Sequence, residues 1–367
     1  MRRLIVCADG TWQSDNASDS DGKGVTNVVK MRDAVAPRDR NGVEQIVFYD
    51  AGVGVGNWWT RVMGGAFGDG LSRNVRECYA FLTRTFQPGD QLYFFGFSRG
   101  AFTVRSLAGL VRKCGILPRE DDREIKEAYA FYRERGEKYH PAGALAQEFR
   151  RKHQSRETPI KCLGVWDTVG SLGVPTGGPI GMFTRQRYGF HDVRLSSTVQ
   201  NAFHALAIDE RRKPFSPALW QVREGDLQKD SGQRIEQRWF AGVHSNVGGG
   251  YAECGLSDVA LKWMMERAEG CGLELKPGVL DGLRCDCADR LRESMSPWFR
   301  VFGVYERGID QPQRDPHTGE RLVTFEDVDD TARERHGKGL TPPWQPRNFV
   351  DYWRRNPSRW SPHQPPS

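Results

Sequence analysis

Five short apolar runs are spread along the chain, and polar or amphipathic segments separate them. Runs of this length with few polar positions are typical of strands that are covered on both faces in a parallel sheet. The predicted strands are 3–9, 45–50, 91–97, 160–167 and 237–243.

Amphipathic segments with helical spacing lie between these strands. Apolar side chains fall on one face in 71–86 and again in 123–135. The segment 256–272 is predicted to be a helix with Ser257 as its N-cap and Gly270 near its end. Strands that alternate with helices indicate an α/β fold, with a mainly parallel sheet, helices on both faces and ligand sites at the carboxyl ends of the strands.

One large domain, residues 1–307, is expected to carry this fold. Two segments interrupt it and are expected to form a cap: 115–158 is charged and helical, whereas 170–192 is rich in glycine and proline and is predicted to be a long loop. Residues 308–367 form a polar extension whose last residues are expected to be mobile. The aromatic stretch 348–360 within it is expected to pack on the domain.

Composition narrows the class of protein further. The chain has 367 residues, of which 38% are hydrophobic, and a formal net charge of +6. Positive charges are scattered among acidic ones, so nucleic acid is not an expected partner, whereas contact with an anionic membrane surface is compatible with this charge. No apolar run is long enough for a transmembrane helix or a signal peptide, and we therefore expect the chain to be cytoplasmic as synthesised.

The eight cysteines are dispersed, except for Cys285 and Cys287. This C-x-C pair lacks a matching second pair, so a zinc site is not predicted. Free thiols in a reducing compartment are the expectation, and neither a metal nor another cofactor is expected.

Gly96-Phe-Ser98-Arg-Gly100 fits the pattern G-x-S-x-G. This pattern is informative when a strand precedes it and a helix follows it, because the serine then occupies a sharp turn at the helix N-terminus. The run 91–97 supplies the strand, and the segment from 101 onwards has the composition of the helix. Ser98 is therefore the predicted nucleophile of a serine hydrolase.

A nucleophilic serine needs a base and an orienting acid, which follow it in the order serine, acid, histidine in this fold. Asp167 and His244 each come directly after a predicted strand, and both are downstream of Ser98. They are the predicted acid and base. Asp209 is the competing acid, but its basic neighbours favour a structural ion pair; His204 lies in the helix-like segment "VQNAFHALAI" and is interpreted as a packed histidine.

Two further features would complete such a site. The oxyanion hole is assigned to the backbone N–H of Arg99, after the nucleophile, and to a second N–H from Gly10 or Thr11, after the first strand. Trp58 and Trp59 lie in a glycine-rich stretch that follows a strand end. They are interpreted either as a lid that contacts a lipid surface or as side chains that pack over the core.

Several motifs together resemble the catalytic domain of type VI secretion lipase effectors. They are "ADGTW", "YDAGVG", "GFSRGAF", "VWDTVGSLG", "ALAIDERRKPFSPALW" and "WFAGVHSNVGGGYAECGLSDVALKWM", and they span roughly residues 3–265. The resemblance implies an α/β-hydrolase fold, phospholipase activity on glycerophospholipids without a metal, and Ser98, Asp167 and His244 as the triad. Asn246 stands where the family often has an aspartate. The resemblance also implies export by a type VI system and a secretion or immunity partner.

Two other functions remain open. A soluble carboxylesterase or thioesterase for small substrates would use the same triad, and a non-catalytic binding protein could retain the same scaffold. Nucleotide binding is not supported, because the glycines of "GVGVG" (52–56) lack the G-x-G-x-x-G spacing.

Overall fold

The structure is a computed structural model. It describes residues 1–10, 23–52, 67–169, 195–227, 232–295, 297–300, 303–316 and 318–359. Thr11, Trp58, Trp59 and the predicted loop 170–192 lie outside them.

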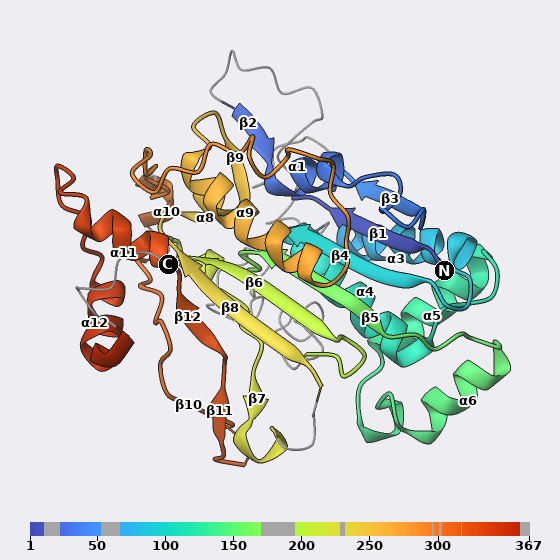
Figure 1. Cartoon of the computed structure of the whole chain (residues 1–367). Coiled ribbons are helices and arrows are strands. Elements are labelled where there is room, and N and C mark those ends of the chain that lie inside the picture. The colour runs from blue at the N-terminus through green and yellow to red at the C-terminus, as the bar shows by residue number, and fades with distance from the viewer. Residues whose placement is uncertain are drawn as a thin grey trace.

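A seven-stranded parallel sheet forms the centre of the described part of the chain (Figure 1). It contains all five predicted strands and two others, and every neighbouring pair is parallel. The strand order is β12 (Glu326–Val328), β8 (Arg234–Phe240), β6 (Asn201–Ala207), β5 (Ile160–Trp166), β4 (Gln91–Phe97), β1 (Arg3–Ala8) and β3 (Gln45–Asp50). Because the strands are parallel, their carboxyl ends share one edge of the sheet.

Helices cover both faces of this sheet, as the sequence predicts. On one face, α3 (Phe67–Thr85), α4 (Arg99–Cys114) and α5 (Asp122–Arg133) pack against residues such as Leu4 and Val6 of β1. On the other face, α1 (Asn27–Ala34) and α9 (Gly255–Gly270) pack against the intervening residues Ile5 and Cys7 (Figure 1). Alternate side chains of one strand thus enter two separate cores, which explains the nearly continuous apolar runs.

The C-terminal segment adds to the same sheet. β12 pairs with β8 at one edge, and α11 (Asp330–Gly337) and α12 (Arg347–Arg355) follow it. Phe349 and Tyr352 of α12 are fully buried in a third apolar cluster with Trp239 of β8. The aromatic stretch therefore packs on the domain, as expected from the sequence.

The other described elements are short or peripheral. The predicted helical insertion 115–158 contains α5, η2 (Glu137–Tyr139) and α6 (Ala144–Lys152). Two small antiparallel sheets are formed by β10 (Gln313–Arg314), β11 (Arg321–Val323) and β7 (Val222–Arg223), and by β2 (Lys23–Thr26) and β9 (Gly249–Tyr251). The remaining helices are η3 (Lys213–Phe215), η4 (Glu224–Asp226), α8 (His244–Gly248), α10 (Pro297–Arg300) and η5 (Pro357–Arg359).

Two local predictions were wrong. The helix-like segment around His204 is strand β6, because its apolar side chains are buried on both faces between β5 and β8, and this packing outweighs the helix propensity of its alanines. Helix α9 begins at Gly255 with Cys254 as its N-cap, so Ser257 lies within the first turn. The Ser257 hydroxyl donates to the Cys254 carbonyl (3.0 Å) instead of accepting from the helix.

Within the described ranges, no helix combines the length and the apolarity needed to cross a bilayer. The same residues contain no group of three or more His, Cys, Asp or Glu side chains arranged to hold a metal ion.

Candidate active site

Ser98 occupies a sharp turn between β4 and α4. Its backbone has φ 57° and ψ −115°, and positive φ is rarely adopted by a residue with a side chain. Its N–H donates to the carbonyl of Trp166 (3.1 Å), which ties the turn to the end of β5. The sequence predicts this strained strand-turn-helix unit, and the turn places Ser98 at the N-terminus of α4, where the helix dipole favours negative charge.

The flanking glycines are required by close backbone contacts. A Cβ atom at Gly96 would lie 2.5 Å from the carbonyl oxygen of Gly100, and a Cβ atom at Gly100 would overlap the carbonyl of Ala8 in β1. A Cβ atom essentially never comes this close to another non-bonded atom, so the turn could not form in this place with larger residues. The G-x-S-x-G pattern is thus explained by the packing of α4 onto the sheet.

Three side chains meet at the carboxyl edge of the sheet. The Nε2 atom of His244, at the start of α8 after β8, lies 2.9 Å from the Ser98 hydroxyl oxygen. The His244 Nδ1 atom lies 2.6 Å from Oδ2 of Asp167, which directly follows β5. The three strand ends therefore place a hydroxyl, an imidazole and a carboxylate in one hydrogen-bonded series, which is the arrangement that activates a serine.

A fourth side chain in this series was missed by the sequence analysis. Arg307 is 1% exposed, and its guanidinium donates to both carboxylate oxygens of Asp167, at 2.6 and 3.0 Å. Asp167 also accepts the backbone N–H of Ala207 (3.1 Å). Arg307 lies in a polar stretch with no periodic pattern, so no local signal marks it as buried.

Comparison with known proteins identifies the family. Residues 2–267 match the family model described as "T6SS, Phospholipase effector Tle1-like, catalytic domain". The chain belongs to this family.

A yeast protein is also similar in sequence to this chain. A curated yeast protein, "Uncharacterized protein YEL023C" of Saccharomyces cerevisiae (strain ATCC 204508 / S288c), is 29% identical over 234 residues, which cover 58% of this chain and 32% of the yeast protein. This chain therefore corresponds to about a third of the length of that relative.

Two solved structures are similar at low sequence identity. One is the crystal structure of an uncharacterized protein from Pseudomonas aeruginosa, with a TM-score of 0.47 and 17% identity over 83% of this chain and 49% of that one. The other is titled "Structure of the Tle1 effector bound to the VgrG spike from the Type 6 secretion system", with a TM-score of 0.43 and 13% identity over 89% of this chain and 92% of that one.

The carboxylate of the Tle1-like site is held in its ionised form. Burial alone would raise the pKa of Asp167, but the charge of Arg307 and the hydrogen bonds from His244 and Arg307 outweigh burial and hold that pKa well below its usual range. Burial lowers the pKa of His244, and the nearby charge of Arg212 lowers it further, although Asp167 opposes both effects. The resting site thus combines a carboxylate with a neutral imidazole, which is the state in which His244 can accept a proton from Ser98.

The lowered pKa of His244 predicts the pH dependence of any reaction at Ser98. Activity requires neutral His244, so it should fall as the pH drops through the pKa of this residue, which lies below its ordinary value of about 6.5. We expect the acid limb of kcat/KM for a soluble chromogenic ester to lie below roughly pH 6.5. A limb above neutral pH would contradict a buried, neutral His244.

Glu210 and two aromatic rings surround His244. The Glu210 carboxylate accepts the His244 backbone N–H (3.2 Å) and binds Arg212 through two hydrogen bonds of 2.9 and 2.8 Å. The rings of Phe97 and Phe215 lie 4.6 and 5.0 Å from the imidazole. The histidine is therefore fixed through its backbone and packed against two aromatic rings.

Asp209 was predicted to form a structural ion pair, but its contacts are hydrogen bonds to uncharged groups. Its carboxylate accepts the backbone N–H of Gly242 (2.7 Å) and the indole N–H of Trp344 (3.0 Å). Within the described residues it forms hydrogen bonds rather than the expected ion pair. These contacts hold the turn before His244 in place, and Asp167 occupies the position next to the imidazole instead.

His204 is a packed histidine, as the sequence analysis concluded, although it lies in a strand. Its Nε2 atom accepts the N–H of Thr168 (3.1 Å), and its Nδ1 atom bonds to Gln237 (3.1 Å). Burial, together with the charge of Arg105, lowers the pKa of His204 to about 3. It is therefore neutral and supports the loop that carries Asp167.

Two of the predicted oxyanion donors, Gly10 and Arg99, are within the described residues, and both lie beside Ser98. A Cβ atom at Gly10 would lie 3.4 Å from the Ser98 Cβ atom, so Gly10 borders the hydroxyl. The Gly10 N–H donates to the Asp9 carboxylate (2.7 Å) in this geometry. Arg99 is the first residue of α4, and its N–H belongs to the first turn of the helix. Thr11 lies outside the described residues.

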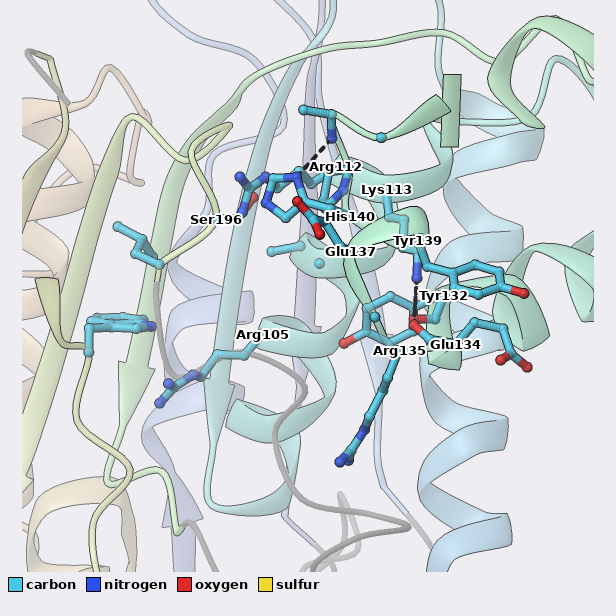
Figure 2. Close-up of a pocket in the computed structure, with 18 of the residues that line it drawn as sticks. Arg105, Arg112, Lys113, Tyr132, Glu134, Arg135, Glu137, Tyr139, His140 and Ser196 are labelled. Carbon is cyan, nitrogen blue, oxygen red and sulfur yellow. Dashed lines mark hydrogen bonds between the residues drawn. The ribbon is translucent and has the colours of Figure 1, made fainter. Parts of the chain in front are cut away.

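A separate cavity of about 770 Å³ lies along α4 (Figure 2). Arg105 and Lys113 line it from the helix, and Glu134 lines it from the residue after α5. The Lys113 ammonium donates to the Glu134 carbonyl (2.8 Å). None of the three triad side chains is among the described residues that line this cavity, so it is distinct from the site at Ser98.

Proposed function

We propose that this domain is a serine hydrolase that cleaves carboxylic esters of glycerophospholipids. The observation that carries the proposal is the 2.9 Å contact between the Ser98 hydroxyl and His244, whose other ring nitrogen lies 2.6 Å from the ionised Asp167. Membership of the phospholipase effector family supports lipid esters as the substrate class.

In the proposed reaction, His244 Nε2 takes the hydroxyl proton while Ser98 Oγ attacks the acyl carbonyl carbon. Asp167 retains its hydrogen bond to Nδ1 and stabilises the imidazolium that forms. The oxyanion is stabilised by the N–H of Arg99 and by a second N–H, from Gly10 or Thr11. His244 then protonates the departing alcohol, and water, activated by the same histidine, hydrolyses the acyl-enzyme.

Mass spectrometry of a total bacterial lipid extract, before and after incubation with the purified protein, tests this function. We expect intact glycerophospholipids to decrease, while lysophospholipids and free fatty acids increase, and we expect Ser98→Ala to leave the extract unchanged. Unchanged lipids together with cleavage of a short soluble ester would favour a carboxylesterase or thioesterase. Inactivity on both would favour a binding protein.

Export is the second part of the proposal. The family comprises effector-type domains of the type VI secretion system, and we infer that this chain is delivered by such a system with a secretion or immunity partner. Detection of the chain outside producing cells, but not outside cells that lack the secretion apparatus, tests this inference. Equal release from both strains would contradict it.

A further inference from the structure

Arg307 is buried beside the active site, although it comes from the C-terminal part of the chain. It lies beyond residues 2–267, which match the family model, and 140 positions after its partner Asp167. The segment around it is joined to the residues after β6, because the Tyr305 N–H donates to the Arg211 carbonyl (2.9 Å). Arg307 is thus held in place by backbone contacts as well as by its side chain.

The guanidinium of Arg307 connects three parts of the site. It bonds to both oxygens of Asp167, to the Ala207 carbonyl at the end of β6 (2.9 Å) and to the Phe215 carbonyl in η3 (2.5 Å). Asp167 is the hydrogen-bond partner of His244, and the Phe215 ring lies edge-on to the same imidazole. Arg307 therefore fixes two of the groups that determine where the His244 ring lies.

We propose that Arg307 is a positioning residue of this hydrolase, which orients His244 through Asp167 and Phe215. The inference rests on the proposed function, because it assigns a role within the same triad. The planar, bidentate geometry is specific to arginine, since a lysine offers three N–H groups on one nitrogen and cannot reproduce these four hydrogen bonds.

The sign of the electrostatic effect follows from the charges around the imidazole. Asp167 and Glu210 favour imidazolium, whereas Arg212 and Arg307 oppose it. Removal of the Arg307 charge leaves the negative charge of Asp167 uncompensated, so the imidazolium becomes more stable and the pKa of His244 rises. Among the described residues, Asp167, Glu210 and Arg212 act on the charge of His244, Arg307 faces Asp167, and Tyr251 lies near Glu210 and Arg212.

The rate of Ser98 labelling by a fluorophosphonate, measured as a function of pH, tests the role of Arg307. For Arg307→Met we expect a labelling rate about 10- to 100-fold lower at its optimum, because a displacement of about 1 Å in a reacting group can lower a rate by about 10²-fold. We also expect the acid limb to move up by roughly one pH unit. Arg307→Lys keeps the charge, so its rate should fall while its acid limb stays near that of the wild type.

The matched control is Arg3→Met. Arg3 also forms a buried arginine–aspartate pair, with Asp39 (2.9 Å), but at the opposite end of β1 from the active site. Arg3→Met should lower thermal stability without moving the pH profile of Ser98 labelling. If Arg307→Met and Arg307→Lys lose stability but keep the wild-type rate and acid limb, the positioning role is wrong.

The two proposals can fail separately. If the wild-type protein does not label at Ser98, the proposed hydrolase function is contradicted. If the wild-type protein labels normally and the Arg307 variants label with the same rate and pH profile, only the inference about Arg307 is overturned. If Arg307→Met does not fold, Arg307→Lys alone tests the positioning role. A wild-type labelling rate in Arg307→Lys would show that the bidentate geometry is not needed.

Discussion

Replacement of Ser98 by alanine should abolish covalent labelling by a fluorophosphonate and lower the turnover of a chromogenic ester by roughly 10⁵- to 10⁶-fold. In the proposed mechanism Ser98 supplies the atom that attacks, and among the described residues no other hydroxyl lies 2.9 Å from the His244 Nε2 atom. Labelling with a fluorescent fluorophosphonate, followed by peptide mass spectrometry, measures the first effect, and steady-state kinetics measures the second.

Ser106→Ala provides the control, because Ser106 is a buried serine on the same helix α4. This variant should label and turn over like the wild type. Thermal unfolding of Ser98→Ala should also resemble that of the wild type, since the substitution keeps the strained backbone and removes only a half-buried hydroxyl. Equal labelling of Ser98→Ala and the wild type would show that another residue is the nucleophile.

The turn at Ser98 and the hydrogen-bonded series of Ser98, His244 and Asp167 could be predicted from the sequence because their signals are local. The pattern at Gly96, Ser98 and Gly100 reflects close backbone contacts, within the strand-turn-helix unit at Gly96 and with the neighbouring strand β1 at Gly100. Asp167 and His244 each follow an apolar strand, and parallel strands bring their carboxyl ends together regardless of distance along the chain. Knowledge of the strand ends was therefore enough to place all three side chains at one edge.

Features that depend on tertiary packing could not be found in the same way. The segment around His204 has a helical composition, and only burial between β5 and β8 makes it a strand. Strand β12 has three residues, too few to give a periodic signal. Arg307 contacts Asp167 across 140 positions, and an arginine in a polar stretch is normally expected at the surface.

The acid and the base should have effects of different size. We expect His244→Ala to lower turnover by several orders of magnitude, close to the effect of Ser98→Ala, because no proton acceptor then faces the hydroxyl. Asp167→Asn should lower turnover by roughly 10⁴-fold, since an amide can hold the imidazole in the wrong tautomer and does not stabilise the imidazolium. Steady-state kinetics with a soluble ester measures both.

Asp167→Asn should also destabilise the fold, because it removes the anion that pairs with Arg307. Breaking a buried ion pair by neutralising one partner costs about 3–5 kcal/mol, and both Asp167 and Arg307 are almost completely buried. Activity must therefore be measured well below the unfolding temperature of each variant. Asp209→Asn is the matched control: it also replaces an aspartate near His244, but Asp209 is only partly buried, and its described side-chain hydrogen bonds are to Gly242 and Trp344. Near-wild-type turnover in Asp167→Asn, with loss in Asp209→Asn, would transfer the role of the acid to Asp209.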